Sequence, residues 1–399
     1  MDWRGGIGLG GRMGSSLLRV GLDRVAEWRG AALPRTAEEL ATPEAINALL
    51  PRGAGRVAHA SLPGVRFESS NCTNFLVDVE WEGPGERDAD RPGSLYAKLP
   101  CPELGTRVFA NALGFWSVEC AFARSLADRV PIRVPRVHAV AERGARFVLL
   151  LENLQAEPGI RLFNNREMAA GTSIERARRC LDTFAELHAA FWGLGEGERE
   201  ALFPRRLHAY LAPGARARTR ALNAMAIAPA HRAAPDIFTA RHAELCRRAI
   251  VKWNALVGAL YEEPLTVIHG DSHLANFFEY AGPDGPRMGM IDFQGTHWGH
   301  GIRDVQYFLV DSLEPQLLAA HEDTLIDGYL ASLARRGVTL DRTAARERYR
   351  ASVFQTLMVA VVSLGLGSLT EREETVRTLL ARCVAAVDRL DFAGWLEAL

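Results

Sequence analysis

The sequence is poor in lysine: of its 47 basic residues, only Lys98 and Lys252 are lysines. Its net charge of −1 provides no basic field that would recruit nucleic acid, so we expect no nucleic-acid partner. The six cysteines are scattered without a CxxC pair. Their spacing argues against a zinc ribbon or a disulfide framework and favours a reducing, cytoplasmic setting.

Long apolar runs are also missing. The N-terminus, MDWRGGIGLGGRMGSSLLRV, has no stretch long enough for a signal peptide or a membrane span, and we expect about residues 1–16 to be disordered. The most apolar segment, Val353–Leu366, is interrupted by polar residues and glycines. It therefore predicts a buried helix, and we expect no membrane association.

What is present predicts an α+β protein. A chain of 399 residues is long enough for two lobes with cores of their own. The region 64–151 is rich in strand patterns, because apolar and polar residues alternate in short runs between turn signals. We predict strands at Phe75–Trp81, Ser94–Leu99, Pro135–Val140 and Arg146–Leu151, with a helix at Ala112–Leu126.

Beyond this region the pattern becomes helical. Ile174–Trp192 and Val376–Leu390 carry apolar residues at the three- and four-residue spacing of a buried helix face. We therefore predict a smaller N-terminal lobe over residues 1–151 and a larger, mostly helical lobe over 152–399. The hinge between the two lobes is expected near Glu152–Gln155.

Two polar clusters follow short apolar strands. The stretch VIHGDSHLANFF contains Asp271 and Asn276, and MIDFQ contains Asp292. The turn sequence AGPDGPR between them predicts an antiparallel hairpin centred on Asp284. That register places Asn276 opposite Asp292, to within a residue or two, with Asp271 one short loop upstream.

Two carboxylates and an amide at one point suit a hard cation such as Mg²⁺. A carboxylate beside the metal, Asp271, is placed to accept a proton from a hydroxyl group, as phosphoryl transfer requires. The same chemistry needs a lysine for the nucleotide phosphates. Lys98 lies in the predicted strand SLYAKL, and Glu119 on the following helix is its expected counter-ion, because an unpaired buried lysine is costly.

Together these segments resemble the aminoglycoside phosphotransferase and choline kinase-like superfamily. The motifs are HGDSHLAN, IDFQ, LYAKL, VECAFARSL, LLLENL and LDTFAELHAAFW, and the pairing of IDFQ with GHGIRDVQYFL leans toward the ecdysteroid-kinase-like branch. The resemblance covers roughly residues 65–330. It implies a bilobal protein-kinase-like fold and transfer of the γ-phosphoryl group of ATP, with Mg²⁺, to a hydroxyl of a small molecule.

The resemblance also implies roles for single residues. Asp271 would be the catalytic base, Asn276 and Asp292 the Mg²⁺ ligands, and Lys98 the phosphate ligand held by Glu119. The chain departs from the family in the phosphate-covering loop, where Phe67–Phe75 (FESSNCTNF) stands in place of glycines. The remaining implied positions are Ser69, Ser70 and Asn71 over the phosphates, the backbone of Glu152 and Leu154 at the adenine, and His269 and Asp304 as supports of the catalytic loop.

Two other functions stay open at this point. His269, Asp271, His273 and Asp292, with His297 and His300 nearby, form a set that could hold Zn²⁺ in a metallohydrolase, although Lys98, Glu119 and Asn276 would then have no role. A nucleotide-binding pseudokinase is supported only by the unusual phosphate loop.

The arginines of Arg205–Arg220 predict a solvated face, a disordered segment or a surface for an anionic substrate. The identity of the hydroxyl acceptor and the oligomeric state cannot be read from the sequence.

Overall fold

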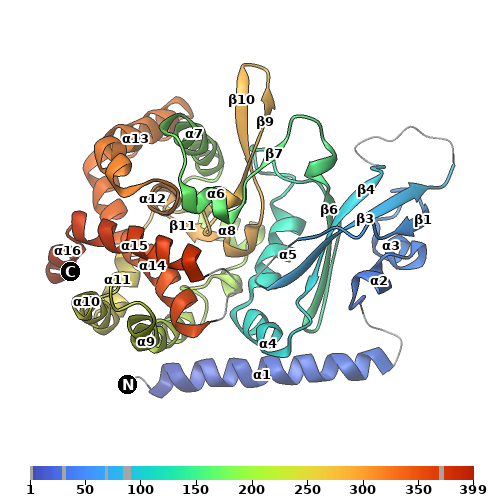
Figure 1. Ribbon diagram of the computed structural model, residues 1–399, viewed down its shortest axis with the longest axis horizontal. Helices are drawn as coiled ribbons and strands as arrows, with labels where there is room; N and C mark the ends of the chain where they lie inside the picture. Colours follow the sequence, from blue (N-terminus) through green and yellow to red (C-terminus); the bar gives the residue numbers. More distant parts are fainter. Residues whose placement is uncertain (1–2, 29–32, 68–70, 84–90, 368–372) are drawn as a thin grey trace. The chain divides into compact units, whose positions relative to one another are not determined.

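The computed structural model describes residues 3–28, 33–67, 71–83, 91–367 and 373–399 (Figure 1). The chain divides into two compact units. One contains Gly10–Arg129 and Val134–Ile160, and the other contains Val130–Arg133 and Arg161–Leu399 with the first turns of the N-terminal helix. We call the first the sheet unit and the second the helical unit.

The sheet unit is built on an antiparallel sheet. Within the described residues its strand order is β1-β3-β4-β6-β5, and β2 pairs with β3 outside this path. The predicted strands are present with small shifts in their ends. The strands are β1 (Val57–Ser61), β2 (Arg66–Phe67), β3 (Cys72–Trp81), β4 (Ser94–Pro100), β5 (Val137–Arg143) and β6 (Arg146–Glu152).

Both faces of this sheet are covered, as the alternation of apolar side chains along the strands requires. Phe75 and Val77 of β3 pack with α2 (Ala37–Leu40) and α3 (Pro43–Leu49). Cys72 of β3 and Leu149 of β6 lie on the other face, with Trp116 and Cys120 of α5 (Phe115–Ser125). The 3₁₀ turn η1 (Leu154–Ala156) follows β6 near the end of the unit.

The predicted helix over Ala112–Leu126 corresponds to α5, and a further helix that was not predicted, α4 (Leu104–Leu113), precedes it. Gly114 separates them with φ of 83°, a left-handed backbone conformation that glycine adopts without steric strain. The apolar periodicity continues across this break, and for that reason the pattern alone did not reveal it.

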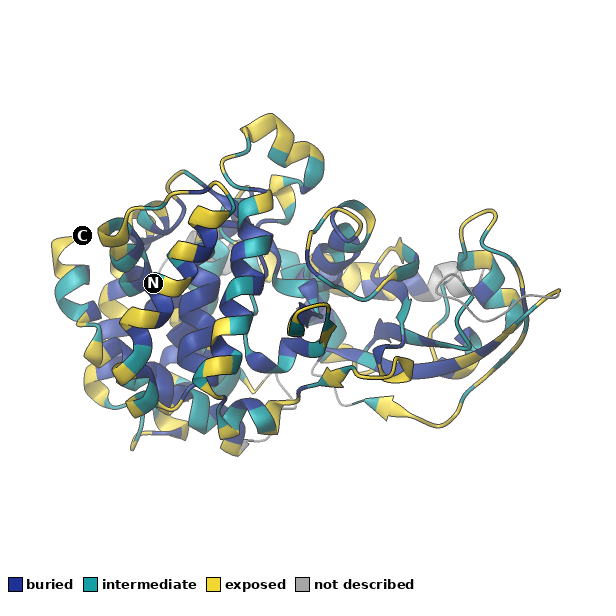
Figure 2. Ribbon diagram, turned by 90° about the horizontal axis from the view of Figure 1, so that it is seen from above, coloured by how far each residue is buried: buried dark blue, intermediate teal, exposed yellow. Residues whose placement is uncertain are grey.

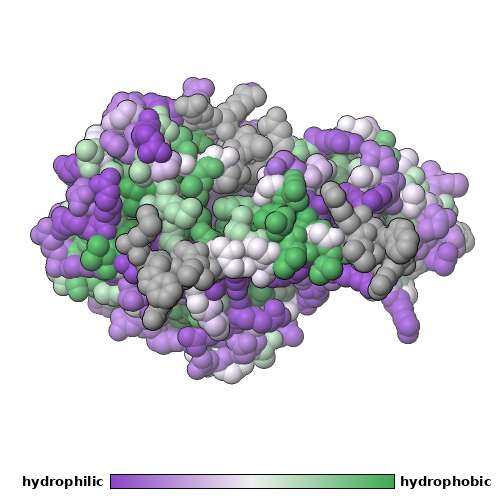
Figure 3. All heavy atoms as spheres, turned by 90° about the horizontal axis from the view of Figure 1, so that it is seen from below, coloured by the Kyte–Doolittle hydropathy of each residue, from purple (hydrophilic) through white to green (hydrophobic). Residues whose placement is uncertain are grey.

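The expectation of disorder is wrong for residues 3–16, which belong to a long helix, α1 (Trp3–Trp28); residues 1 and 2 lie outside the described part of the chain. Ser16 donates a hydrogen bond to the carbonyl oxygen of Val108 (2.7 Å), and Val20 packs against Val108 and Ala145. These contacts stabilise a glycine-rich helix that local propensity disfavours. Three leucines of α1, Leu17, Leu18 and Leu22, are exposed. Figure 3 views the molecule from below Figure 1, where hydrophobic and hydrophilic residues are interspersed on the surface.

The helical unit is built around a central helix, α12 (Gly301–Ser312), in which every residue is buried. Figure 2 shows the same trend across this unit, with buried inner faces and exposed outer ones. The other helices are α6 (Asn165–Ala170), α7 (Ile174–Ala190), α8 (Glu196–Leu202), α9 (Ala215–Ala233), α10 (Ala240–Val251), α11 (Trp253–Leu260), α13 (Pro315–Arg335), α14 (Arg342–Leu366), α15 (Glu373–Arg389) and α16 (Phe392–Ala398).

Small β elements in the helical unit carry the polar motifs. β9 (Phe277–Gly282) and β10 (Gly285–Met290) form the predicted hairpin, and β9 also pairs with β7 (Arg161–Leu162). A separate pair is formed by β8 (Thr266–Ile268) and β11 (His297–Gly299). These strands present the loops on which the candidate site is built.

The helix predicted at Val353–Leu366 is confirmed as the second half of α14. Among the described residues, α14 alone has the length and composition of a membrane span, but 61% of its apolar window is buried within the fold. Such burial is also found in the core helices of soluble proteins. The segment Arg205–Arg220 is ordered, in the 3₁₀ turn η2 (Arg205–Leu207) and the first turns of α9.

Candidate active site

The loop after β8 carries the HGD motif and lies against the loop after β10. Gly270 has φ of 84°, and a Cβ atom there would lie 2.0 Å from the carbonyl oxygen of Gly295. A Cβ on Gly295 would in turn lie 3.1 Å from the backbone nitrogen of Asp271. The two loops can approach this closely only because both positions are glycine.

The hairpin brings Asn276 and Asp292 to its open end, as predicted. Met290 pairs with Phe277, and the backbone N–H of Ile291 donates to the carbonyl oxygen of Asn276 (2.9 Å). Asn276 therefore lies opposite Ile291, and Asp292 follows one residue later. The register differs by one residue from the predicted pairing, which is within the expected tolerance.

Asp271 and Asn276 are in direct contact. The Asn276 Nδ2 group donates to the backbone carbonyl of Asp271 (2.8 Å) and lies 3.4 Å from its Oδ2 atom. Because the amide nitrogen is used inside the loop, the amide oxygen, which is the atom that binds cations, points away from these bonds. Asn276 thus fixes the position of its amide oxygen relative to the Asp271 carboxylate.

Asp292 has a left-handed backbone, with φ of 62° and ψ of 68°. Such a conformation is uncommon for a residue other than glycine and costs of order 1 kcal/mol. Asp292 ends the hairpin and precedes the 3₁₀ turn η4 (Phe293–Gly295). A strained backbone at an acidic residue that lies at a strand end is typical of a functional position.

Asp304, on the first turn of α12, holds the HGD loop. Its carboxylate accepts hydrogen bonds from the backbone N–H groups of His269 (2.6 Å) and Gly270 (3.1 Å) and from the hydroxyl of Ser272. Burial alone would raise the pKa of Asp304, but His188, with which it forms a hydrogen bond, and the Arg303 charge outweigh it and lower the pKa. Asp304 is therefore a permanently charged anchor for the loop.

His269 bridges the two loops and is fully buried. Its Nε2 atom lies 2.8 Å from the carbonyl oxygen of Ile291, so Nε2 donates, and Nδ1 accepts from the backbone N–H of Asp271 (3.3 Å). Burial lowers the pKa of His269, despite the neighbouring carboxylates. Both ring nitrogens of His269 are thus hydrogen-bonded. The neutral imidazole links the backbone of Asp271 in one loop to the backbone of Ile291, the residue before Asp292, in the other.

Helix α12 supplies two further contacts that the sequence analysis missed. The Tyr307 hydroxyl donates to Asp271 Oδ1 (3.0 Å), and the Arg303 guanidinium donates to the carbonyl oxygen of Gly270 (2.7 Å). Tyr307 lies three residues after Asp304, hence on the same helix face. That spacing in RDVQYF was the available signal, but it gains meaning only once Asp304 is known to face the loop.

Replacing Tyr307 with Phe is therefore expected to lower the turnover rate about tenfold or more, while the KM for nucleotide stays within about twofold. The ring and its packing remain, and only the hydrogen bond that orients the Asp271 carboxylate is lost. Steady-state kinetics of the variant, with thermal unfolding as a check on folding, tests this. A change confined to KM would contradict a role in positioning Asp271.

Asp311, near the end of α12, is a buried acid close to the site. Burial, with the nearby Asp271 charge, raises its pKa to about 7, although His273 and Arg382 act in the opposite direction. Since this pKa lies above that of the unfolded chain, the protonated group favours the folded state. The stabilisation is present below about pH 4 and is lost as the pH rises to about 7.

We expect the variant Asp311→Asn to lack this loss of stability. A pKa difference of roughly three between the two states corresponds to about 4 kcal/mol. Buried histidines such as His297, whose pKa is lowered to about 4, make the folded state more stable as the pH rises. The prediction therefore concerns the difference in pH-dependent stability between Asp311→Asn and the wild type, in which the contribution of the histidines cancels. Urea unfolding at pH 5 and pH 8 measures the part of this loss that falls between the two pH values, about 3 kcal/mol. Asp284→Asn, at an exposed position, is the control, and parallel pH curves of Asp311→Asn and the wild type would contradict the prediction.

In the sheet unit, Lys98 and Glu119 form the expected ion pair. The Lys98 Nζ atom lies 2.6 Å from Glu119 Oε1, and the two side chains are only 5% and 7% exposed. Lys98 lies on β4 and Glu119 on α5, so the pair joins the sheet to the helix that covers it. A buried ammonium group paired in this way is fixed in place.

The phosphate-loop positions are only partly described. Ser69 and Ser70 lie outside the described residues. Asn71 is buried, and its Oδ1 atom accepts from the Cys72 thiol (3.0 Å). At the predicted adenine position, Asn153 caps the turn η1 through Gln155 N–H (3.1 Å), next to Glu152 and the buried Leu154.

The histidines do not assemble a metal site. Among the described residues, no three His, Cys, Asp or Glu side chains are grouped as metal ligands. Both ring nitrogens of His297 have protein partners, the carbonyl oxygen of Gly295 (2.7 Å) and the hydroxyl of Tyr261 (3.2 Å). The zinc alternative therefore has no support from this geometry.

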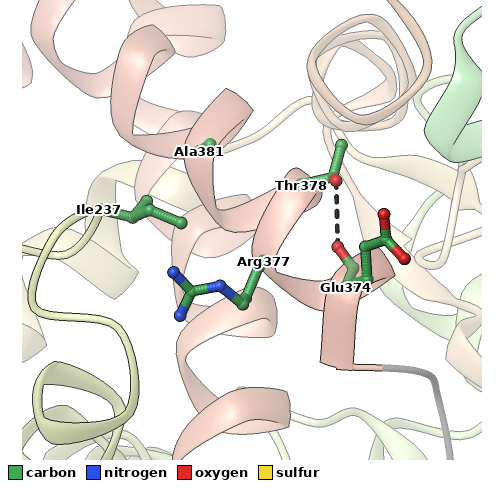
Figure 4. A pocket seen from close by; sticks show the side chains of 5 residues that line it. All are labelled: Ile237, Glu374, Arg377, Thr378 and Ala381. Atoms are coloured by element: carbon green, nitrogen blue, oxygen red, sulfur yellow. Dashed lines mark hydrogen bonds between the residues drawn. The ribbon is translucent and has the colours of Figure 1, made fainter.

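A surface hollow of about 590 Å³ lies elsewhere in the helical unit, between α15 and the loop before α10 (Figure 4). It is lined by Ile237, Glu374, Arg377, Thr378 and Ala381. Arg377 is paired with Asp236 (2.7 Å), and the bond drawn from Thr378 to Glu374 is internal to α15. None of the candidate active-site residues lines it.

The described geometry is that of an α+β protein with a kinase-like fold. The model of the ecdysteroid kinase-like family matches residues 121–341. This match covers more than half of the chain, and the chain belongs to the ecdysteroid kinase-like family. As a member of this family, it is a small-molecule kinase.

Solved structures with a similar fold are distant in sequence. An ethanolamine kinase from Plasmodium vivax is 12% identical, with 82% of this chain and 81% of that chain covered and a TM-score of 0.46. A choline kinase from Streptococcus pneumoniae is 10% identical, with coverage of 84% and 94% and a TM-score of 0.45. The GDP complex of aminoglycoside 2′-phosphotransferase-IIIa is 15% identical, with coverage of 80% and 93% and a TM-score of 0.41. A comparison with curated proteins finds no match.

Proposed function

We propose that this kinase transfers the γ-phosphoryl group of ATP to a hydroxyl group of a small molecule in a Mg²⁺-dependent reaction. The observation that carries the proposal is the contact of Asp271 with Asn276 at the end of the hairpin that also presents Asp292. Carboxylate and amide oxygens are the donors that Mg²⁺ prefers, so the residues present fit the ion. Bound there by Asn276 and Asp292, Mg²⁺ would neutralise charge on the phosphates.

In this proposal Asp271 is the base. Its Oδ1 atom accepts a hydrogen bond from the Tyr307 hydroxyl, and the Asp271 side chain is 27% exposed. Burial acts to raise the pKa of Asp271, but His273, His269 and the Tyr307 hydrogen bond lower it below its usual value. The group is therefore ionised at neutral pH and ready to accept the proton of the acceptor hydroxyl, while Asp304 keeps the loop in place.

Lys98 has the role of binding the nucleotide phosphates in this proposal, with Glu119 fixing its ammonium group. A compact point charge suits this task better than the planar guanidinium that the chain uses almost everywhere else. The backbone of Glu152 and Leu154 is the proposed adenine contact. We place the enzyme in the reducing interior of a cell, because none of the six cysteines, all of which lie in the described part of the chain, forms a disulfide.

The experiment that tests the function is ADP release by the purified protein over a library of hydroxylated metabolites and antibiotics with Mg·ATP. The proposal expects turnover with at least one acceptor and none with Lys98→Met. Binding of Mg·ATP without turnover on any acceptor, and without slow ATP hydrolysis, would instead indicate a nucleotide-binding protein that does not catalyse transfer.

A further inference from the structure

One polar side chain next to Lys98, that of Asn74, has a buried acceptor atom to which the described part of the fold gives no partner. In the pairing of β3 with β4, Asn74 lies directly opposite Lys98. Directly opposed residues in an antiparallel pair project from the same face of the sheet, with Cβ atoms about 5 Å apart. Asn74 is 8% exposed and Lys98 4% exposed, so the amide and the ammonium share one buried environment.

The Oδ1 atom of Asn74 is buried and has no hydrogen-bond partner within the described part of the chain. Leaving a buried acceptor unpaired is unfavourable, because the group has lost its hydrogen bonds to water and has gained none in the protein. Cys72, two residues earlier on the same face of β3, packs with the apolar residues Trp116 and Phe147. An apolar side chain at position 74 would suit such surroundings without this penalty, so the fold does not explain the amide.

We propose that Asn74 is a second phosphate-binding side chain beside Lys98, an inference that rests on the proposed function. Its Nδ2 group donates to a phosphate oxygen of the nucleotide, and its Oδ1 atom accepts from the Lys98 ammonium group. A carboxamide matches both neighbours, because it offers two N–H donors to an anion and one acceptor to a cation. It also supplies donors in a chain whose Phe67–Phe75 segment lacks the glycines of the family's phosphate loop.

The test compares the binding of Mg·ATP and of adenosine by calorimetry in Asn74→Leu, Asn74→Asp and the wild type. We expect Asn74→Leu to weaken Mg·ATP binding about tenfold, and Asn74→Asp to weaken it further, because the added charge repels phosphate. Adenosine, which has no phosphate, should bind equally to all three. Asp78→Asn, an exposed change on the same strand, is the matched control and should bind both ligands as the wild type does.

Thermal unfolding separates this role from a purely structural one. Asn74→Leu should be at least as stable as the wild type, since it removes an unpaired buried acceptor. Unchanged Mg·ATP affinity in Asn74→Leu, or equal weakening of adenosine and Mg·ATP, would overturn the inference while the proposed function stands. Failure of the wild type to bind Mg·ATP, or normal binding by Lys98→Met, would overturn the proposed function and the inference with it.

Discussion

Replacing Asp271 with Ala is expected to lower phosphoryl transfer by about 10²–10⁴-fold, the usual contribution of a positioned base, and to leave the Kd for Mg·ATP within about twofold. The carboxylate contacts Tyr307 and Asn276, and in our proposal it meets the acceptor rather than the nucleotide. The measurement is ADP release with the acceptor found by screening, alongside calorimetric titration with Mg·ATP.

The companion variant, Asp292→Ala, should lose activity in a different way. As a proposed Mg²⁺ ligand, Asp292 should affect both turnover and the affinity for Mg·ATP, and raising the Mg²⁺ concentration should restore part of the binding. Asp284→Ala, on the exposed turn of the same hairpin, is the control and should change neither quantity. Equal loss of Mg·ATP binding in the Asp271 and Asp292 variants would show that the roles are wrongly assigned.

Replacing Asp304 with Ala should produce the largest loss of stability at the site, about 3–5 kcal/mol in the free energy of unfolding. The substitution leaves the backbone N–H groups of His269 and Gly270 and the Ser272 hydroxyl buried without their acceptor. It also removes the charge that faces His188, whose Nε2 atom lies 3.3 Å from Asp304 Oδ2. Turnover should fall as well, because the loop that carries Asp271 is no longer held.

Ser272→Ala is the matched control for Asp304→Ala. It deletes one of the hydrogen bonds to the same carboxylate and keeps the others, so we expect a loss of about 1 kcal/mol. Urea unfolding of both variants at neutral pH gives the comparison. Wild-type stability in Asp304→Ala would mean that the loop finds other partners and that α12 does not anchor it.

The elements most readily predicted are those whose signal is local. The hairpin that carries Asn276 and Asp292 was predictable because strand patterns flank the turn AGPDGPR, and turn chemistry sets register to within a residue. The pairing of Lys98 with Glu119 was predictable for a different reason. A lysine in an apolar strand needs an acid nearby, and the following helix offers one on its buried side.

Local patterns failed where a distant part of the chain decides the conformation. Helix α1 contains many glycines, and its order comes from contacts such as Ser16 with Val108, 92 residues away. The break at Gly114 is a single left-handed residue inside a continuous apolar periodicity. In both cases tertiary packing or one backbone angle overrides the propensity of the segment.

By itself, the sequence determined which residue types are available for chemistry and at which strand ends they lie. Both can be read from the sequence because apolar periodicity and turn residues shape the backbone only over a few neighbouring positions. Only the tertiary structure decided how they are held. Tyr307 reaches Asp271 across 36 residues, and Asp304 binds the backbone of His269 across 35. Such contacts leave no local pattern, because they depend on how α12 packs beneath the loop rather than on the residues next to it in the chain.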